Sequence, residues 1–232
     1  MQNYISEEAL FHFVGRSQAT DSERFDTLCR IIREGALSHA PHTQKGSKFG
    51  LSLDFDGRGR WLGKLLTEEH DNELVFDNLV CLADVPVTKL GQHMQKYSQF
   101  GIGIDKRFAA ESGARPVTYY PYWDEEPWRS LSGQSAISMI ERSAAAIAED
   151  KTCDDKLKKL VLLDFIGFLK PFNMSLPPKH ADQYYSEREW RIVGYLHFSD
   201  AHIRHIVVPE DYIDQLREMF PHLAGQIFAA PP

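Results

Sequence analysis

Short apolar runs separated by turn residues are the feature that most constrains the fold of this chain. Residues 9–15, 79–86, 100–105 and 203–208 are such runs, and each ends at or beside glycine, proline or aspartate. Runs of this length that are rich in β-branched and aromatic residues predict buried strands. A more polar run, residues 187–195, predicts a further strand near the C-terminus.

Helical segments lie between these strands. Residues 20–35 begin with a capping-box pair, Thr20 and Glu23, and end at a glycine, which is the usual punctuation of a helix. Phenylalanine, leucine, cysteine and isoleucine recur on one face of this segment. Shorter helices are expected over residues 89–97 and 209–219. Strands and helices in this order predict an α+β fold.

The segment 119–171 is expected to be an insertion in that fold. It starts with an aromatic loop, Tyr119 to Trp128, which suits a partner contact, a lid over a pocket or a core plug. Two helices are then expected, at residues 134–149 and 154–169. No internal repeat or long linker divides the sequence, so a single domain over residues 1–232 is expected.

Composition and charge narrow the classes of protein. Hydrophobic residues make up 43% of the 232 residues and charged residues 25%, which is typical of a globular chain. The formal net charge is −7 and no basic stripe is present, so tight sequence-independent binding of nucleic acid is not expected. No apolar run is long enough to cross a membrane, and the N-terminus lacks a signal-peptide pattern. Three separated cysteines, Cys29, Cys81 and Cys153, favour a reducing cytoplasm.

Standard catalytic and metal-binding motifs are absent from the sequence. There is no Walker loop, no dinucleotide-binding glycine motif and no zinc-protease motif. His39 and His42, and likewise His202 and His205, are three residues apart, but neither pair has a third ligand at a plausible spacing. We therefore expect no metal site and interpret these side chains as surface histidines.

Two glutamates, Glu187 and Glu189, stand out in the late polar run. On a strand their side chains would share one face, about 7 Å apart. One interpretation is a solvated edge face, with Glu187 and Glu189 beside Arg191 and with Trp190 and Ile192 in the core. The other is a pair of carboxylates that stabilises positive charge and positions an acceptor, as in enzymes that transfer sugars.

Six short motifs are spread along the chain. They are Leu-Phe-His-Phe (10–13), Ile-Ile-Arg-Glu-Gly-Ala-Leu (31–37), Leu-Val-Cys-Leu-Ala-Asp-Val-Pro (79–86), His-Met-Gln-Lys-Tyr (93–97), Phe-Gly-Ile-Gly-Ile (100–104) and Tyr-Ser-Glu-Arg-Glu-Trp-Arg (185–191). Together they resemble the AbiGi family of abortive phage resistance proteins. The resemblance extends over about residues 5–210 and implies a role in phage defence, in a family labelled as an antitoxin.

The order of these landmarks also resembles the layout of ADP-ribosyltransferases, with a histidine on the first strand, a central aromatic residue and a late Glu-x-Glu. This resemblance implies a split β-sheet core with flanking helices, and NAD as a substrate. It implies that His12 binds the ribose or carboxamide end of NAD and that Tyr97 stacks on the nicotinamide. Glu189 would be the catalytic carboxylate and Glu187 the residue that addresses the acceptor.

The implied chemistry fits these residue types. Breaking the nicotinamide–ribose bond builds positive charge on the ribose, and a carboxylate at the 2′-hydroxyl stabilises that charge in the transition state. The resemblance thus implies a toxin-type enzyme that transfers ADP-ribose from NAD to RNA, DNA or protein. Two alternatives stay open: a non-catalytic antitoxin that binds its cognate toxin, and an NAD hydrolase. Glu187 beside Glu189 favours transfer over hydrolysis.

Overall fold

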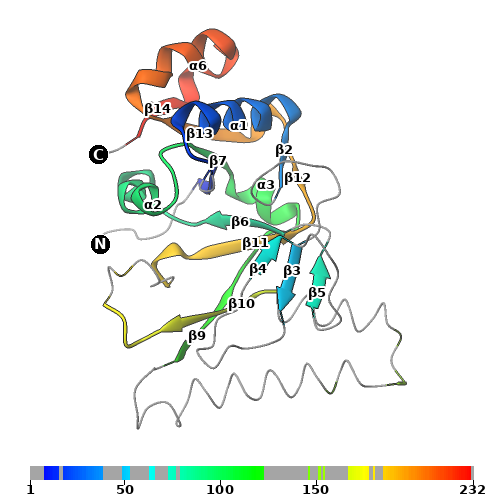
Figure 1. Cartoon of the computed structure of the whole chain (residues 1–232). Helices are drawn as coiled ribbons and strands as arrows, with labels where there is room; N and C mark the ends of the chain where they lie inside the picture. The colour runs from blue at the N-terminus through cyan, green and yellow to red at the C-terminus, as the bar shows by residue number, and fades with distance from the viewer. Residues whose placement is uncertain are drawn as a thin grey trace. The chain divides into compact units, whose positions relative to one another are not determined.

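The structure is a computed structural model that describes most of the chain (Figure 1). Contacts divide it into two compact units: Met1–Lys45, Asn78–Arg115 and Glu187–Pro232 form the first, and Gly46–Asp77 and Pro116–Ser186 form the second. Each unit is described by itself, and the single domain over residues 1–232 stays a prediction. The described residues are 8–15, 18–38, 49–52, 63–65, 73–76, 79–122, 146, 151–152, 154, 167–177, 180 and 185–230.

The first unit is built on one mixed β-sheet, as the predicted α+β fold requires. The predicted strands near residues 9–15, 79–86, 100–105 and 203–208 are all confirmed. The first of them lies in the middle of the sheet and pairs antiparallel with both of its neighbours. The strand order is β14 (Ile227–Ala229), β13 (Ile203–Val208), β7 (Gly101–Asp105), β1 (Ala9–Phe13), β6 (Leu79–Ala83), β11 (Glu189–Val193) and β8 (Arg115–Pro116).

Helices connect these strands. The three helices expected in this unit are confirmed within a few residues, and two of them begin with a 3-10 turn. They are α1 (Asp21–Glu34), α2 (Leu90–Lys96) preceded by η1 (Val87–Lys89), and α6 (Ile213–Met219) preceded by η5 (Glu210–Tyr212); the unit also contains α3 (Lys106–Glu111), η4 (Asp200–His202), η6 (Pro221–Gln226) and a small sheet of β2 (Ala36–Leu37) with β12 (Leu196–His197).

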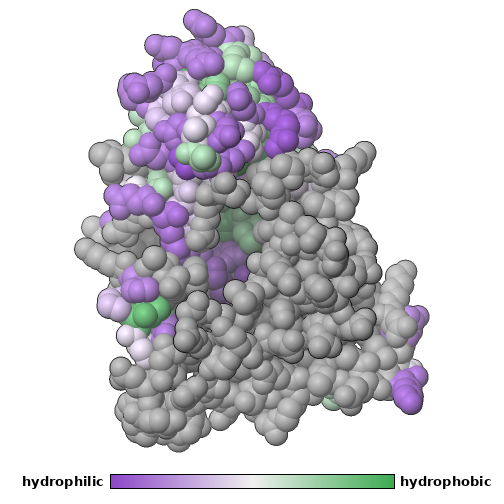
Figure 2. Space-filling model, viewed as in Figure 1, coloured by the Kyte–Doolittle hydropathy of each residue, from purple (hydrophilic) through white to green (hydrophobic). Residues whose placement is uncertain are grey.

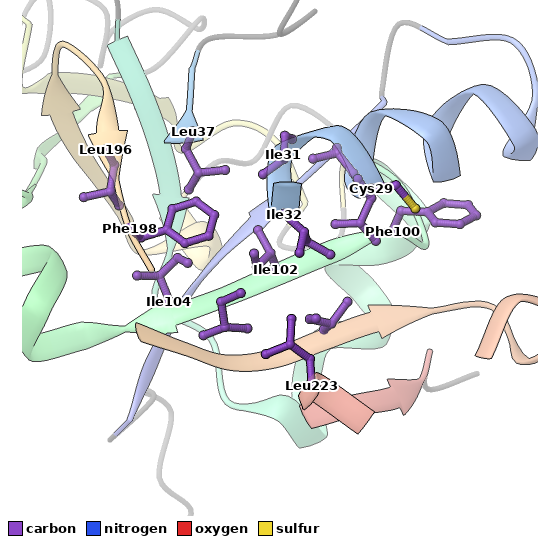
Figure 3. Packing of buried hydrophobic residues seen from close by; sticks show 14 of the residues in the cluster. Cys29, Ile31, Ile32, Leu37, Phe100, Ile102, Ile104, Leu196, Phe198 and Leu223 are labelled. Atoms are coloured by element: carbon purple, nitrogen blue, oxygen red, sulfur yellow. The ribbon is translucent and has the colours of Figure 1, made fainter. Parts of the chain in front are cut away.

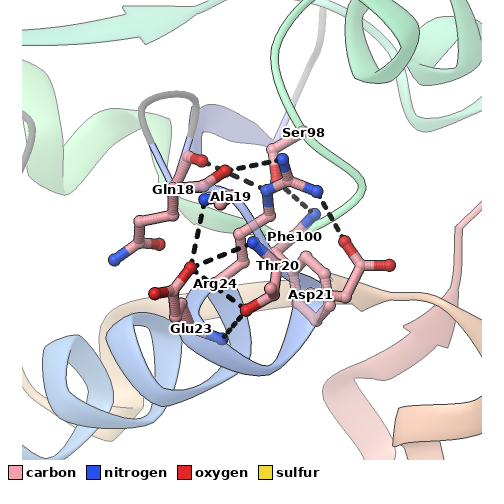
Figure 4. A network of polar contacts seen from close by, with 9 residues as sticks. Gln18, Ala19, Thr20, Asp21, Glu23, Arg24, Ser98 and Phe100 are labelled. Atoms are coloured by element: carbon pink, nitrogen blue, oxygen red, sulfur yellow. Dashed lines mark hydrogen bonds and ion pairs between the residues drawn. The ribbon is translucent and has the colours of Figure 1, made fainter.

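The start of α1 shows how local sequence fixes an element (Figure 4). The Thr20 hydroxyl accepts a hydrogen bond from the Glu23 backbone N–H at 3.3 Å, and the Glu23 carboxylate accepts one from the Thr20 N–H at 3.0 Å. Arg24 ties this turn to the end of β1 by donating from Nε to the Gly15 carbonyl at 3.2 Å. Gly35 ends the helix with φ 58°, a left-handed conformation that suits glycine.

The two faces of the sheet bury different apolar clusters. The larger cluster joins α1 and α6 to alternate residues of the strands, including Leu10 and Ile102 (Figure 3). The smaller cluster lies on the opposite face, where Phe11 and Ala83 pack with Leu90 of α2. Because side chains alternate along a strand, each residue of β1 belongs to either the α1 face or the α2 face.

The second unit contains two small sheets. β9 (Thr118–Tyr122) and β10 (Leu169–Asn173) pair in parallel, and β3 (Phe49–Ser52) pairs antiparallel with β4 (Gly63–Leu65) and β5 (Glu73–Phe76). The rings of Tyr119, Phe172 and Tyr185 contact one another, with centroids 4.9 Å to 6.2 Å apart, and Tyr185 is 57% exposed.

The predicted end of the second inserted helix is wrong. Leu169 begins strand β10, which continues through Pro171, and residues 167–168 form a turn. Proline restricts the residue before it to extended conformations, so Lys170 favours a strand at this point. Most of the expected helices at 134–149 and 154–169, and residues 123–128 of the aromatic loop, lie outside the described residues.

The described surface over α1 and α6 is mostly hydrophilic, with single apolar side chains between the polar ones (Figure 2). Within the described ranges, no helix combines the length and apolar character needed to cross a bilayer.

Candidate functional site

The residues from Glu187 to Arg191 enter the sheet through an irregular turn. Glu187 belongs to the 3-10 turn η3 (Tyr185–Glu187), and β11 starts only at Glu189. Between them, Arg188 has φ 44°, a left-handed backbone that a residue other than glycine rarely adopts. The prediction that both glutamates lie on one extended strand is therefore wrong, because the turn at Arg188 interrupts the strand geometry.

Glu187 is the centre of a buried polar contact with α2. Its carboxylate accepts a hydrogen bond from the Tyr97 hydroxyl. The same carboxylate forms an ion pair with Lys96, with 2.6 Å between Lys96 Nζ and Glu187 Oε1. The residue is only 4% exposed, so the interpretation as a solvated edge carboxylate is wrong for this position. A buried carboxylate keeps its charge at acceptable cost only when cations and donors surround it, and Lys96 and Tyr97 supply both.

Glu189 is likewise buried and ion-paired. It is 6% exposed, and Arg191 donates from Nε to its carboxylate at 2.6 Å. Ala83 pairs with both Glu189 and Phe11 in the sheet, which places the Glu189 side chain on the α2 face. Both carboxylates are thus directed to the same side of the sheet, although one of them is not part of the strand.

A third buried ion pair completes this region. Asp84, at the end of β6, accepts a salt bridge from Lys106 Nζ at 2.8 Å and is 4% exposed. Its backbone N–H donates to the Arg188 carbonyl at 3.2 Å, which fixes the irregular turn to β6. Lys106 also lies over the Trp190 ring, 5.3 Å from its centroid.

The Tyr97 ring is held by aromatic packing. Phe13 stacks on it with a centroid distance of 6.2 Å and an interplanar angle of 11°, and His93 lies 5.8 Å from both rings. Phe13 has room to lie flat because Gly101 is its partner on β7; a Cβ there would lie 3.1 Å from the Phe13 ring. The Tyr97 ring, which is expected to stack on nicotinamide, therefore already stacks on a protein side chain on at least one of its two faces.

His12 belongs to the other face of the sheet. It alternates with Phe11 and Phe13 and pairs with Ile102, a member of the α1-face cluster. Its Nδ1 hydrogen-bonds the Cys81 carbonyl at 2.8 Å, and the residue is 7% exposed. The structure thus brings Tyr97 and Glu187 together, but it separates His12 from Glu189 across the sheet.

The sequence predicts only one of the two cations at this site. Arg191 is expected beside the glutamates, and it forms an ion pair with Glu189 because residues two apart on a strand share a face. Lys96 lies in the 93–97 motif, but its ion pair with Glu187 is not expected from the sequence. No local signal connects Lys96 with Glu187, which lies 91 residues further along the chain.

Two further titratable groups have shifted pKa values. Burial raises the pKa of the Cys29 thiol to about 11, which keeps it protonated and unreactive near neutral pH. Burial lowers the pKa of His205, whose ring stacks on Phe11 at 5.7 Å. Among the described residues, no three His, Cys, Asp or Glu side chains are grouped to hold a metal ion.

The chemistry available to this site follows from its two buried ion pairs, Lys96 with Glu187 and Arg191 with Glu189. Two carboxylates, one ammonium and one guanidinium balance in charge, and each carboxylate already has a charged donor at 2.6 Å. Such an arrangement stabilises the docking of α2 and the entry of β11 more directly than it offers a free carboxylate to a ligand.

Comparison with known proteins gives one match. No curated protein and no solved structure matches the chain. A family model matches residues 70–215, more than half of the chain, and that range contains α2, β6, β7, β11 and the three buried ion pairs. The N-terminal motifs 10–13 and 31–37 lie outside the matched range. By this match, the chain belongs to the family described as "Putative abortive phage resistance protein AbiGi, antitoxin".

Proposed function

We propose that this protein is the antitoxin of an abortive phage resistance system and acts by binding its cognate toxin, without catalysing a reaction. The family description supports this proposal directly. A binding protein needs a rigid scaffold and an accessible surface, and it needs no free nucleophile or acid.

The observation that carries the proposal is the state of the two glutamates. Glu187 and Glu189 are 4% and 6% exposed, and each forms an ion pair at 2.6 Å within the first unit. A catalytic carboxylate must reach the ribose of NAD, so both partners, Lys96 and Arg191, would have to release these groups first. The contacts instead suit residues that hold the fold together.

The competing proposal is an NAD-dependent ADP-ribosyltransferase, or an NAD hydrolase, with Glu189 as its catalytic group. It would require His12 and Glu189 to address one NAD molecule, whereas their side chains belong to opposite faces of the sheet. The juxtaposition of Tyr97 with Glu187 is the feature that this alternative explains best.

Two measurements on the purified protein separate these proposals. The first is titration of the chain with its purified cognate toxin, by calorimetry. The second is incubation with labelled NAD and cell extract, followed by separate protease and nuclease digestion. We expect a saturable complex with the toxin and neither label transfer nor NAD consumption. Label transfer that Glu189→Gln abolishes, without toxin binding, would overturn the antitoxin proposal.

A further inference from the structure

Arg188 has an unusual backbone between two firmly held neighbours. Its φ of 44° makes it the one non-glycine residue with positive φ in the described part of the chain. Glu187 and Glu189 on either side are locked in buried ion pairs, and the Arg188 carbonyl accepts a hydrogen bond from the Asp84 N–H at 3.2 Å. The backbone is thus fixed in a conformation that glycine or asparagine would adopt with less strain.

The side chain of Arg188 contrasts with those around it. Glu187, Glu189 and Arg191 are all ion-paired and largely buried, whereas Arg188 is exposed. Within the described residues, its guanidinium forms no ion pair or hydrogen bond. A strained residue persists when its surroundings impose the strain, and such residues concentrate at functional sites. No contact among the described residues uses this exposed side chain, which makes it available to a binding partner.

We propose that Arg188 is a recognition residue that binds a carboxylate on the toxin; this inference rests on the proposed antitoxin function. The guanidinium presents a planar set of donors that matches a carboxylate in a bidentate geometry. Three buried ion pairs around the turn hold its backbone in place before binding, so less conformational entropy is lost when the contact forms. Arginine is also among the residues enriched at the energetic centres of protein interfaces.

A protein partner fits this residue better than a nucleic acid. A nucleic-acid site needs several cations to neutralise successive phosphates. The chain carries a net charge of −7, and the charged neighbours of Arg188 at positions 187, 189 and 191 are already paired with one another or with α2. One fixed cation on an acidic chain suits a single acidic group on a protein surface.

The test is the affinity of full-length variants for the purified toxin, measured with their melting temperatures. Arg188→Asn removes the charge and relieves the left-handed backbone, so we expect binding at least about tenfold weaker with a melting temperature unchanged or higher by about 2–4 °C. Arg188→Lys keeps the charge but loses the planar fork, and should bind with intermediate affinity. Arg217→Gln, on the exposed side of α6, is the matched control and should bind like wild type.

The outcomes are distinct. Lost binding together with retained or increased stability supports the assignment, because a purely structural arginine would lose stability instead. Wild-type affinity in Arg188→Asn overturns the assignment and leaves the antitoxin function standing. Failure of the wild-type chain to bind the toxin overturns both. Binding of a labelled 20-nucleotide RNA that depends on Arg188, with toxin binding unaffected, would replace the protein partner by a nucleic acid.

Discussion

The phenol of Tyr97 donates a hydrogen bond to the carboxylate of Glu187, although 90 residues separate them in the chain. Lys96, the neighbour of Tyr97, forms an ion pair with the same carboxylate at 2.6 Å. The end of α2 is thereby fixed to the residue that precedes the irregular turn into β11. This contact turns two residues expected to bind substrates into a pair that holds the sheet and its helix together.

The first prediction concerns the stability cost of neutralising the buried glutamates. Glu187→Gln and Glu189→Gln keep the side-chain shape but remove the negative charge that faces Lys96 or Arg191 in a largely buried ion pair. Because each change removes one charge of a largely buried ion pair, we expect it to lower the free energy of unfolding by about 1–4 kcal/mol, measured by urea denaturation.

Glu111→Gln is the matched control for these two variants. Its ion pair with Arg107 is exposed, with side-chain exposures of 63% and 88%, so the loss should be no more than about 0.5 kcal/mol. If all three variants lose the same free energy of unfolding, the three glutamates are equally solvated. In that case the ion pairs of Glu187 and Glu189 are not buried in solution.

The second prediction concerns close packing between β1 and β7. A Cβ at Gly103 would lie 2.8 Å from the Phe11 ring and 3.2 Å from His205 Cβ, so Gly103→Ala should destabilise the protein by about 1–3 kcal/mol. At Gly225 a Cβ would meet no atom within 4 Å, and Gly225→Ala should shift stability by less than about 0.5 kcal/mol. Equal melting temperatures for the two variants would mean that the Phe11 ring does not pack closely against Gly103.

The sequence was sufficient to predict the local elements of the first unit. Apolar runs gave β1, β6, β7 and β13, and the capping box with its terminal glycine gave α1, because these signals act over a few residues. The three-residue strand β14 was missed, since its pairing with β13 depends on tertiary contacts.

The site could be predicted only in part, for the same physical reason. Glu187, Glu189 and Tyr97 were singled out by residue type, but their burial and partners depend on contacts between distant segments. The left-handed backbone of Arg188 has no sequence signal, because arginine seldom adopts it. An expected continuous strand therefore became a 3-10 turn followed by a shorter strand.

The third prediction concerns pH. Burial lowers the pKa of His205 below its ordinary value of 6.5. Two nearby charges have smaller effects: Glu8 raises this pKa, and Arg204 lowers it. The unfolded chain then binds more protons than the folded chain as pH falls below about 6.5, so stability decreases with acidification. His205→Gln should lose less stability than wild type between pH 7.5 and 5.5.

The exposed His197 provides the control for this pH dependence. His197→Gln should retain the wild-type slope of unfolding free energy against pH. An unchanged slope in His205→Gln would show that this histidine is as well solvated when folded as when unfolded.

The fourth prediction concerns thiol reactivity. Cys29 is 1% exposed and its pKa is raised to about 11 by burial, so few molecules carry the reactive thiolate at pH 8. Iodoacetamide should leave Cys29 unmodified in the native protein and modify it fully in urea, as peptide mass spectrometry would report. Rapid labelling of Cys29 under native conditions would contradict its place in the α1-face core.

The central claim is that this chain acts by binding a toxin, with Glu189 as a structural residue. Its most direct test is the growth of bacteria that express the chain alone, the toxin alone or both. We predict normal growth with the chain alone, arrest with the toxin alone, and growth restored when both are present. Arrest by the chain alone that Glu189→Gln relieves, at equal expression and with a folded variant, would contradict the claim and identify a catalytic toxin instead.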